Sequence, residues 1–309
     1  PMTEPLFDKV AVIGLGLIGS SMVRGMKKRG IAVTVTGFDG SAEVRTRADA
    51  LQFCDVVAET AENAVTGADL VVLAVPVGAM AAAAQSIAPY LADGAIVTDV
   101  GSVKAAVVRN VANTLPAHAA FVPGHPVAGT EFSGPEAGFA ELFEGRWCVV
   151  TPCERSTDAS VEKVVALWAT LGSTVETMTP EHHDIVLAIT SHIPHLIAYN
   201  IVGTAADLED VTQSEVIKFS AGGFRDFTRI AASDPVMWRD VFLNNKDAVL
   251  EVLGRFSEDL AALQRMIRWG DGESLEDHFN RTRAIRRGVV DAGQDTADPD
   301  FGRSHGDAD

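Results

Sequence analysis

Short apolar runs alternate with helical patterns from residue 8 to about residue 179. The clearest runs are continuously apolar or β-branched, as strands covered on both faces tend to be. They are Val10 to Ile13, Val33 to Phe38, Leu70 to Val75 and Ala95 to Thr98. Strands that alternate with helices in this way are typical of βαβ units on a parallel sheet. The pattern predicts a doubly wound α/β domain over residues 1–179.

After Pro180 the strand-like runs disappear and long helical periodicities predict an all-helical domain over residues 180–290. Asp234 and Pro235 predict the start of a long helical segment, because aspartate caps helices and proline suits the first helical position. Beyond residue 290 the chain is polar, so we expect a flexible tail over residues 291–309. Within the helical segment, apolar residues recur at the spacing of a heptad seam. We expect this seam either to pack inside the subunit or to form a homodimer interface. Its residues are Val249, Leu253, Phe256, Leu260, Leu263 and Ile267.

A glycine-rich turn, Gly14-Leu15-Gly16-Leu17-Ile18-Gly19, follows the first predicted strand and opens a helix. The first glycine allows the tight turn, the second lets a pyrophosphate approach the backbone, and the third lets helix and strand pack closely. Free amides at the helix start then face the phosphates. The turn therefore predicts a Rossmann domain that binds a nicotinamide dinucleotide. The candidate cofactor-binding residues here are Gly14, Gly16, Leu17, Ile18 and Gly19, with Val75 and Pro76 at the end of the Leu70 to Val75 strand.

Asp39 ends the second predicted strand and is also a candidate cofactor-binding residue. An acidic side chain at this place accepts hydrogen bonds from the adenosine ribose hydroxyls. A 2′-phosphate there would meet the carboxylate at a cost of up to about 4 kcal/mol for charges about 4 Å apart near a surface. Asp39 therefore favours NAD over NADP, although Arg45 and Arg47 lie close by in sequence and could soften the repulsion.

Composition narrows the class of partner. The net charge of −17 disfavours nucleic acid and anionic membranes. We expect neither a signal peptide nor a membrane span, because no charged-then-apolar start and no continuous apolar run of ~18 residues is evident. The three cysteines form no CxxC pair, so we expect reduced, mostly buried thiols, no metal site and a cytoplasmic protein. If the cofactor and a small-molecule substrate are both anions, backbone amides and arginines must attract them locally.

Two segments at predicted strand ends carry candidate chemistry. Ser102 follows the Ala95 to Thr98 strand and is either a helix cap or a site residue, because open α/β sheets bind ligands at the carboxyl ends of their strands. His125 lies between Gly124 and Pro126 just after another strand, where core packing gives little reason for a histidine. An imidazole with an unperturbed pKa of about 6.5 can accept a proton near pH 7.

A third segment lies in the helical domain. Pro194 cannot donate to the Thr190 carbonyl, so the helix should kink and leave a polar opening there. Ser191 and His195 are four residues apart and share a face on one side of that opening.

The fourth segment places Arg229 between Phe227 and Ile230, so we expect its guanidinium to be partly buried. A buried arginine needs an anion. That anion is either Asp226 or Asp234, in a structural pair, or a substrate carboxylate.

These four segments, in this order after the glycine motif, resemble the prephenate and arogenate dehydrogenases of tyrosine biosynthesis, also called cyclohexadienyl dehydrogenases. The resemblance runs from about residue 8 to residue 270. Its strongest marks are Gly101 to Lys104, His125-Pro126 with Gly129-Thr130-Glu131, Ser191 to His195, and Asp226 to Ile230 running into Asp234-Pro235 and Met237 to Asp240.

The resemblance implies roles for residues of these segments. His125 is the catalytic histidine with Ser102 holding its ring, and His195 and Arg229 bind the substrate. The other residues implied at the substrate pocket are Ser191, Thr130, Glu131, Arg225 and Asp226.

The resemblance also implies the reaction, which is NAD-dependent oxidative decarboxylation of prephenate and/or arogenate to 4-hydroxyphenylpyruvate and/or tyrosine. A hydride passes from the ring carbinol carbon to NAD, and the helical domain forms a homodimer. An acidic neighbour would favour the ammonium group of arogenate over the keto group of prephenate. Glu131, Asp184 and Asp226 could each serve.

Two alternatives stay open. A 3-hydroxy acid or pyrroline-carboxylate type of oxidoreductase shares the glycine motif and the Rossmann-plus-helical layout, and Lys104 is the candidate for the lysine that such enzymes use. A non-catalytic NAD-sensing protein would need no polar opening beside the nicotinamide.

Overall fold

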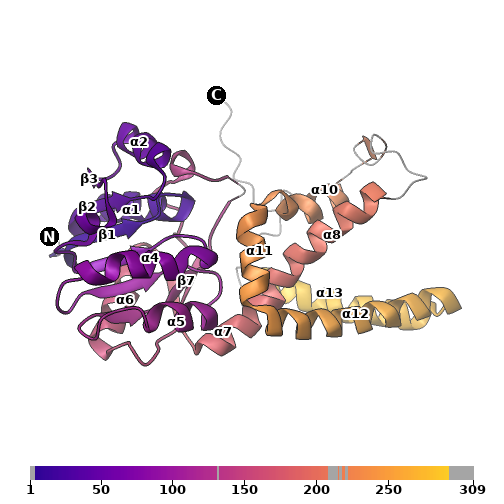
Figure 1. Cartoon of the computed structure of the whole chain (residues 1–309). Helices are drawn as coiled ribbons and strands as arrows, with labels where there is room; N and C mark the ends of the chain where they lie inside the picture. The colour runs from indigo at the N-terminus through magenta and orange to yellow at the C-terminus, as the bar shows by residue number, and fades with distance from the viewer. Residues whose placement is uncertain (1–3, 131, 208–214, 216–217, 220–221, 292–309) are drawn as a thin grey trace. The chain divides into compact units, whose positions relative to one another are not determined.

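The computed structural model describes residues 4–130, 132–207, 215, 218–219 and 222–291. The chain divides into two compact units, the first made of residues 1–196 with 232–249 and the second of residues 197–231 with 250–309. Figure 1 labels the helices and strands of both units.

The first unit contains a parallel six-stranded sheet in the order β3-β2-β1-β4-β5-β6. This is the usual strand order of a dinucleotide-binding Rossmann sheet, so the predicted fold class is confirmed. The four strands predicted from apolar runs are all present, with ends shifted by up to three residues. The strands are β1 (Phe7–Ile13), β2 (Ala32–Phe38), β3 (Val56–Val57), β4 (Leu70–Leu73), β5 (Ile96–Asp99) and β6 (Ala120–Val122).

Helices lie on both faces of this sheet (Figure 1), which is why the central strands are apolar at successive positions. Every residue of β4 is buried. Met22 and Met26 of α1 and Trp168 of α6 belong to one core cluster with side chains of β1 and β4. The helices of this part are α1 (Leu17–Arg29), α2 (Ala42–Leu51), α3 (Ala61–Val65), α4 (Met80–Ile87), α5 (Ala105–Ala112) and α6 (Asp158–Thr170).

A second, three-stranded sheet follows the Rossmann sheet, which the sequence did not predict. Its strands are β7 (Gly124–Pro126), β8 (Trp147–Val150) and β9 (Thr174–Thr177), with β7 antiparallel and β9 parallel to β8. These strands are only three or four residues long, so they carry little periodicity. The pairing of His125 with Val149 fixes the backbone of the candidate base.

From Pro180 onward, the described residues form helices and no strands, as predicted. Asp234 caps α11, because its Oδ1 accepts from the amides of Val236 (2.8 Å) and Met237 (3.0 Å). The predicted tail over 291–309 lies outside the described residues except for Asp291. The helices are α7 (Pro180–Leu187), α8 (Ile193–Asp207), α10 (Gly222–Thr228), α11 (Pro235–Asn244), α12 (Lys246–Trp269) and α13 (Gly272–Asp291), with a π-helical turn (Ala188–His192) between α7 and α8.

One continuous helical run, Pro180–Asp207, is long and apolar enough to cross a membrane by length and composition, with a mean hydropathy of 1.5. Within it, His183, Asp184 and His192 are buried and hydrogen-bonded to other parts of the first unit. A core helix of a folded domain passes the same test, and these bonds are typical of one.

Candidate active site

The three glycines of the GxGxxG turn have the geometry that a dinucleotide requires. Gly14 has a φ of +98°, and a Cβ there would lie 2.3 Å from the Ala74 carbonyl oxygen. A Cβ on Gly19 would lie 1.9 Å from the Gly14 carbonyl oxygen, so only glycine lets α1 pack this closely. By contrast, nothing lies within 4 Å of a Cβ built on Gly16, which leaves open space above the turn.

That open space lies at the start of α1, where backbone amides can bind an anion. Gly16 is the residue before the helix, and no side chain caps it. Leu17 and Ile18 therefore present amide groups toward the space in which a pyrophosphate fits. Val75 follows β4 and lies beside the turn, because its Cγ1 is 3.0 Å from a Cβ built on Gly14. These residues fit the predicted dinucleotide. When bound there, NAD would supply the hydride acceptor.

Asp39 is held at the end of β2 by the turn itself. Its Oδ2 accepts from the Leu15 amide at 3.0 Å, and its Oδ1 accepts from the Ser41 amide at 2.9 Å. Arg45 donates to the carbonyl oxygen of Asp39 at 2.8 Å, and Arg47 makes a two-pronged ion pair with Glu136. Both arginines are thus engaged by protein acceptors, so neither is committed to a 2′-phosphate and NAD is favoured.

His125 is buried in β7, between Gly124 and Pro126, with 7% of its surface exposed. Its Nδ1 lies 2.8 Å from His183 Nε2. Burial, together with the charges of His183 and Lys104, holds the pKa of His125 well below its usual range. The ring is therefore neutral at physiological pH and can act as a hydrogen-bond and proton acceptor.

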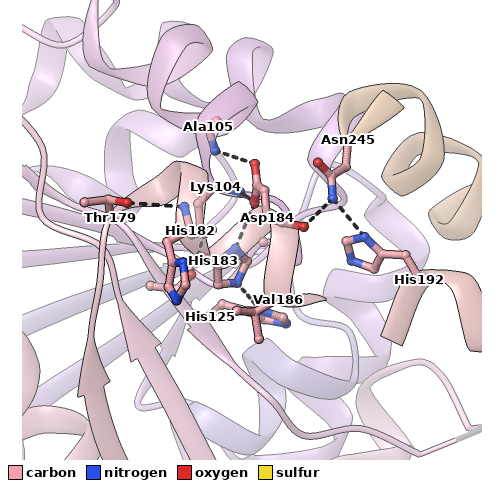
Figure 2. A network of polar contacts seen from close by, with 12 residues as sticks. Lys104, Ala105, His125, Thr179, His182, His183, Asp184, Val186, His192 and Asn245 are labelled. Atoms are coloured by element: carbon pink, nitrogen blue, oxygen red, sulfur yellow. Dashed lines mark hydrogen bonds and ion pairs between the residues drawn. The ribbon is translucent and has the colours of Figure 1, made fainter. Parts of the chain in front are cut away.

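Behind His125 a buried polar network continues to the start of α5 (Figure 2). His183 Nδ1 lies 2.8 Å from Asp184 Oδ1. Asp184 also accepts from the amides of Lys104 (2.8 Å) and Ala105 (3.0 Å), the residues at which α5 begins. A carboxylate on these amides is favourable because the N-terminal end of a helix carries partial positive charge.

Lys104 and Asp99 form a fully buried ion pair beneath β7. Lys104 Nζ also donates to the Gly124 carbonyl oxygen, next to His125, and Asp99 Oδ2 accepts from the Gly101 amide at 2.8 Å. Burial lowers the pKa of Lys104, and the neighbouring Asp99 carboxylate opposes that shift. With no exposed atom and both partners in place, this lysine holds the structure together and is poorly suited to act on a substrate.

Pro194 produces the predicted break, and its form is the π-helical turn Ala188–His192. The Ile193 amide donates to the Ala188 carbonyl oxygen, one residue farther back than in an α-helix. His195 Nδ1 lies 2.8 Å from the Ser191 carbonyl oxygen, so the contact is with the backbone of Ser191, and the polar opening beside these two side chains stays a prediction. The His195 ring stacks on Trp238 of α11 with 3.7 Å between ring centroids and 22° between planes.

His192, in the same π-helical turn, faces the protein interior. Asn245 Nδ2 donates to the Asp184 carbonyl oxygen at 2.9 Å and lies 3.1 Å from His192 Nδ1. Burial, followed by the charge of His183, lowers the pKa of His192 to about 4. This ring is also neutral at physiological pH.

Some predicted contacts differ in the structure. The ring partner of His125 is His183, and Ser102 makes no hydrogen bond to His125 within the described residues, so the role of Ser102 stays a prediction. Thr130 is exposed and accepts from the Phe132 amide at 3.2 Å through its Oγ1. Glu131 lies outside the described residues.

The arginine segment belongs to the second unit. Arg225 Nε donates to Asp226 Oδ1 at 3.3 Å. The expectation that Arg229 is partly buried was wrong, because it is exposed and Phe227 is 50% exposed. Apolar neighbours in sequence do not by themselves bury an arginine, and the 3-10 turn Arg229–Ala232 has no buried residue. The convergence of Arg229 and His125 on one substrate stays a prediction.

Sequence reasoning missed the residues that support the site. His183 was not identified, and Asp184 was considered only as an acidic neighbour of the substrate. The sequence signal that could have identified them is the adjacent polar pair His183-Asp184, which closely follows the Thr179 cap of α7. Asn245 and the stacking role of Trp238 gave no local signal, because their partners lie about fifty residues away.

Comparison with known proteins agrees with this geometry. The prephenate dehydrogenase nucleotide-binding domain matches residues 22–177, and the prephenate dehydrogenase dimerization domain matches residues 179–281. A cyclohexadienyl dehydrogenase of Zymomonas mobilis is 43% identical over 91% of this chain and 96% of its own length.

Two solved structures share the fold over most of the chain. A prephenate dehydrogenase of Aquifex aeolicus, in complex with hydroxyphenyl propionate and NAD+, is 34% identical with a TM-score of 0.84, covering 91% of this chain and 98% of its own. A Synechocystis arogenate dehydrogenase is 26% identical with a TM-score of 0.77, covering 91% of this chain and 100% of its own. With both domain models matched in order and a relative 43% identical over 91% of the chain, this chain belongs to the prephenate dehydrogenase family.

Proposed function

We propose that this protein catalyses the NAD-dependent oxidative decarboxylation of prephenate and/or arogenate, giving 4-hydroxyphenylpyruvate and/or tyrosine. The observation that carries the proposal is His125, a buried neutral imidazole in β7, the strand that directly follows the last strand of the Rossmann sheet, in a domain whose first turn fits a dinucleotide. As a base, His125 would accept the proton of the substrate's hydroxyl group during hydride transfer.

The residues of the protein have few chemical tasks in this reaction. A hydride leaves the ring carbinol carbon for NAD, the hydroxyl proton passes to His125, and the ring carboxylate leaves as carbon dioxide. The ring becomes aromatic and takes a proton back on its oxygen, so the net products are the phenol, carbon dioxide and NADH. The residues of this chain must therefore orient the substrate, accept one proton and hold an anion.

Substrate binding falls to the helical part. We assign His195, kept in place by the Trp238 ring and the Ser191 carbonyl, to the substrate. Arg229 is the proposed partner of a substrate carboxylate, since a hydrogen bond to a charged group contributes about 1.5–3 kcal/mol. A chain of net charge −17 needs such a local cation to attract an anion. The remaining proposed contacts are Ser191, Thr130, Glu131, Arg225 and Asp226.

Fewer residues remain as candidates for the preference between prephenate and arogenate. Asp184 was one candidate for an acidic partner of the arogenate ammonium group. Its carboxylate is 7% exposed and already accepts from two amides and His183, so it has little capacity left for a substrate. Glu131 and Asp226 remain the proposed determinants of this preference.

We also propose that the protein is a homodimer formed by its helical part. In support, the matched family model describes a dimerization domain. The heptad seam of α12 is only partly covered by its own chain, with Leu260 49% and Ile267 68% exposed. A second copy would bury these side chains. The three cysteines are free, which agrees with the reducing cytoplasm as the proposed compartment.

Steady-state turnover tests the proposed function. The purified protein should reduce NAD with prephenate or arogenate, followed as NADH absorbance, and release one carbon dioxide for each NADH. Comparison of kcat/KM for the two substrates gives the preference. NAD binding without turnover on either substrate would favour the non-catalytic sensor, and NADH formation from 3-hydroxy acids alone would favour the other oxidoreductase class.

A further inference from the structure

The buried network behind His125 begins at a group that only accepts hydrogen bonds. Asp184 accepts from two backbone amides, that of Lys104 on Oδ1 and that of Ala105 on Oδ2. An ionised carboxylate accepts and never donates. The contact of 2.8 Å between Asp184 Oδ1 and His183 Nδ1 therefore places a proton on His183 Nδ1.

The proton on Nδ1 fixes the role of the other ring nitrogen of His183. Burial lowers the pKa of His183, so its ring is neutral and carries one proton only. Its Nε2 then has a lone pair and must accept from His125 Nδ1, which lies 2.8 Å away. His125 is neutral too, so its single proton is on Nδ1 and its Nε2 is the free acceptor.

We propose that His183 and Asp184 are positioning residues that hold His125 in the tautomer protonated at Nδ1, so that Nε2 accepts the substrate's proton. The tautomer follows from these hydrogen bonds between two neutral rings, and only its use in catalysis rests on the proposed function. His183 has no exposed surface and uses both ring nitrogens within the protein, so it acts through His125 and not on the substrate.

The same residues tie the base to the surrounding backbone. Asp184 joins α7 to the first amides of α5, and its carbonyl oxygen accepts from Asn245 Nδ2 (Figure 2). Other ionisable groups near His125 include Lys104, before α5, and His192, in the π-helical turn, and a positive charge on either disfavours a second proton on the ring. The buried Cys148 thiol of β8 contacts the His125 backbone.

Nitrogen NMR reads the tautomer without any assay of activity. In protein labelled with ¹⁵N-histidine, the His125 signals are identified by their absence from His125→Asn. We expect a protonated Nδ1 and an unprotonated Nε2 at pH 7, in the protein without substrate. A proton on Nε2 with a bare Nδ1 would overturn the proposal.

Three variants test whether the tautomer depends on the pair. Asp184→Ala removes the oxygen that accepts from His183 Nδ1, so neither ring tautomer is fixed and the His125 proton is expected to spread over Nδ1 and Nε2. We expect kcat/KM to fall by about 10²- to 10⁴-fold, the usual contribution of a general base. His183→Met removes the acceptor and should also lower kcat/KM, whereas His183→Gln can accept through its amide oxygen and should restore most of the activity and the Nδ1 proton.

Matched controls lie on the same helix turn. Glu181→Gln removes an exposed charge and His182→Gln an exposed ring, and both should leave the tautomer and kcat/KM unchanged. If Asp184→Ala folds and keeps both the parent tautomer and the parent kcat/KM, the pair has no positioning role. If it fails to fold, the wild-type spectrum and the contrast between His183→Gln and His183→Met still decide. The expected tautomer in a protein without turnover on either cyclohexadienol would sink the proposed function and leave the tautomer assignment intact.

Discussion

The buried Lys104–Asp99 pair gives the sharpest prediction about stability. Lys104→Met removes the cation and leaves the Asp99 carboxylate with no exposed surface and no counter-charge. Removing one member of a buried pair costs about 3–5 kcal/mol. Asp99 keeps two amide donors, Gly101 at 2.8 Å and Gly124 at a longer 3.3 Å, so we expect a loss near the lower end, about 3 kcal/mol. That is a large share of the roughly 5–15 kcal/mol by which a protein is stable.

Urea unfolding of parent and variants measures this loss. The double variant Lys104→Met with Asp99→Asn should recover part of it, because neutral groups of similar size replace a buried pair at little cost. Lys246→Met, at an exposed lysine, is the control and should change the unfolding free energy by less than about 0.5 kcal/mol. A Lys104→Met protein within 1 kcal/mol of the parent that has lost all turnover would refute this reasoning and point to a catalytic lysine.

Three other predictions concern the substrate, the cofactor and pH. Arg229→Ala should raise KM for the cyclohexadienol by about tenfold to a hundredfold with little change in kcat, since about 1.5–3 kcal/mol of carboxylate binding is lost; a fall in kcat alone would contradict its role. Asp39→Asn should narrow the preference for NAD over NADP in kcat/KM by at least about tenfold, because the repulsion of a 2′-phosphate is removed, and an unchanged ratio would contradict this. Because the folded-state pKa of His192 is lowered to about 4, its contribution to stability is complete above pH 6.5, the unfolded value, and is lost as pH falls through 4. At about 1.4 kcal/mol per pKa unit, roughly 3 kcal/mol should be lost by pH 4, and urea unfolding of His192→Asn should show a smaller acid loss than the parent.

The Rossmann sheet could be predicted from sequence because its strands are covered on both faces. Continuous apolar runs such as the one in β4 leave few alternatives, and the glycine turn has a geometry that few other sequences satisfy. The break at Pro194 was also predictable, since a missing amide must disturb the helix locally. Its form as a π-helical turn was not predictable, because that form depends on the Ile193 amide reaching the Ala188 carbonyl oxygen, five residues back.

The support of the site could not be predicted, because it depends on contacts between distant segments. His125 and His183 are 58 residues apart, and Asp184 is 80 residues from the Lys104 amide that it accepts from. No periodicity links such positions. The exposure of Arg229 was mispredicted for a related reason, since neighbours in sequence were taken as neighbours in space.

The central claim is that His125 accepts the substrate's proton. Steady-state kinetics of His125→Asn with saturating NAD test it most directly, because the backbone pairing of β7 with β8 does not depend on the imidazole. We expect kcat to fall by about 10²- to 10⁴-fold while KM for the cyclohexadienol changes only a few-fold. A kcat that stays within about tenfold of the parent, or a loss that is confined to KM, would contradict the claim.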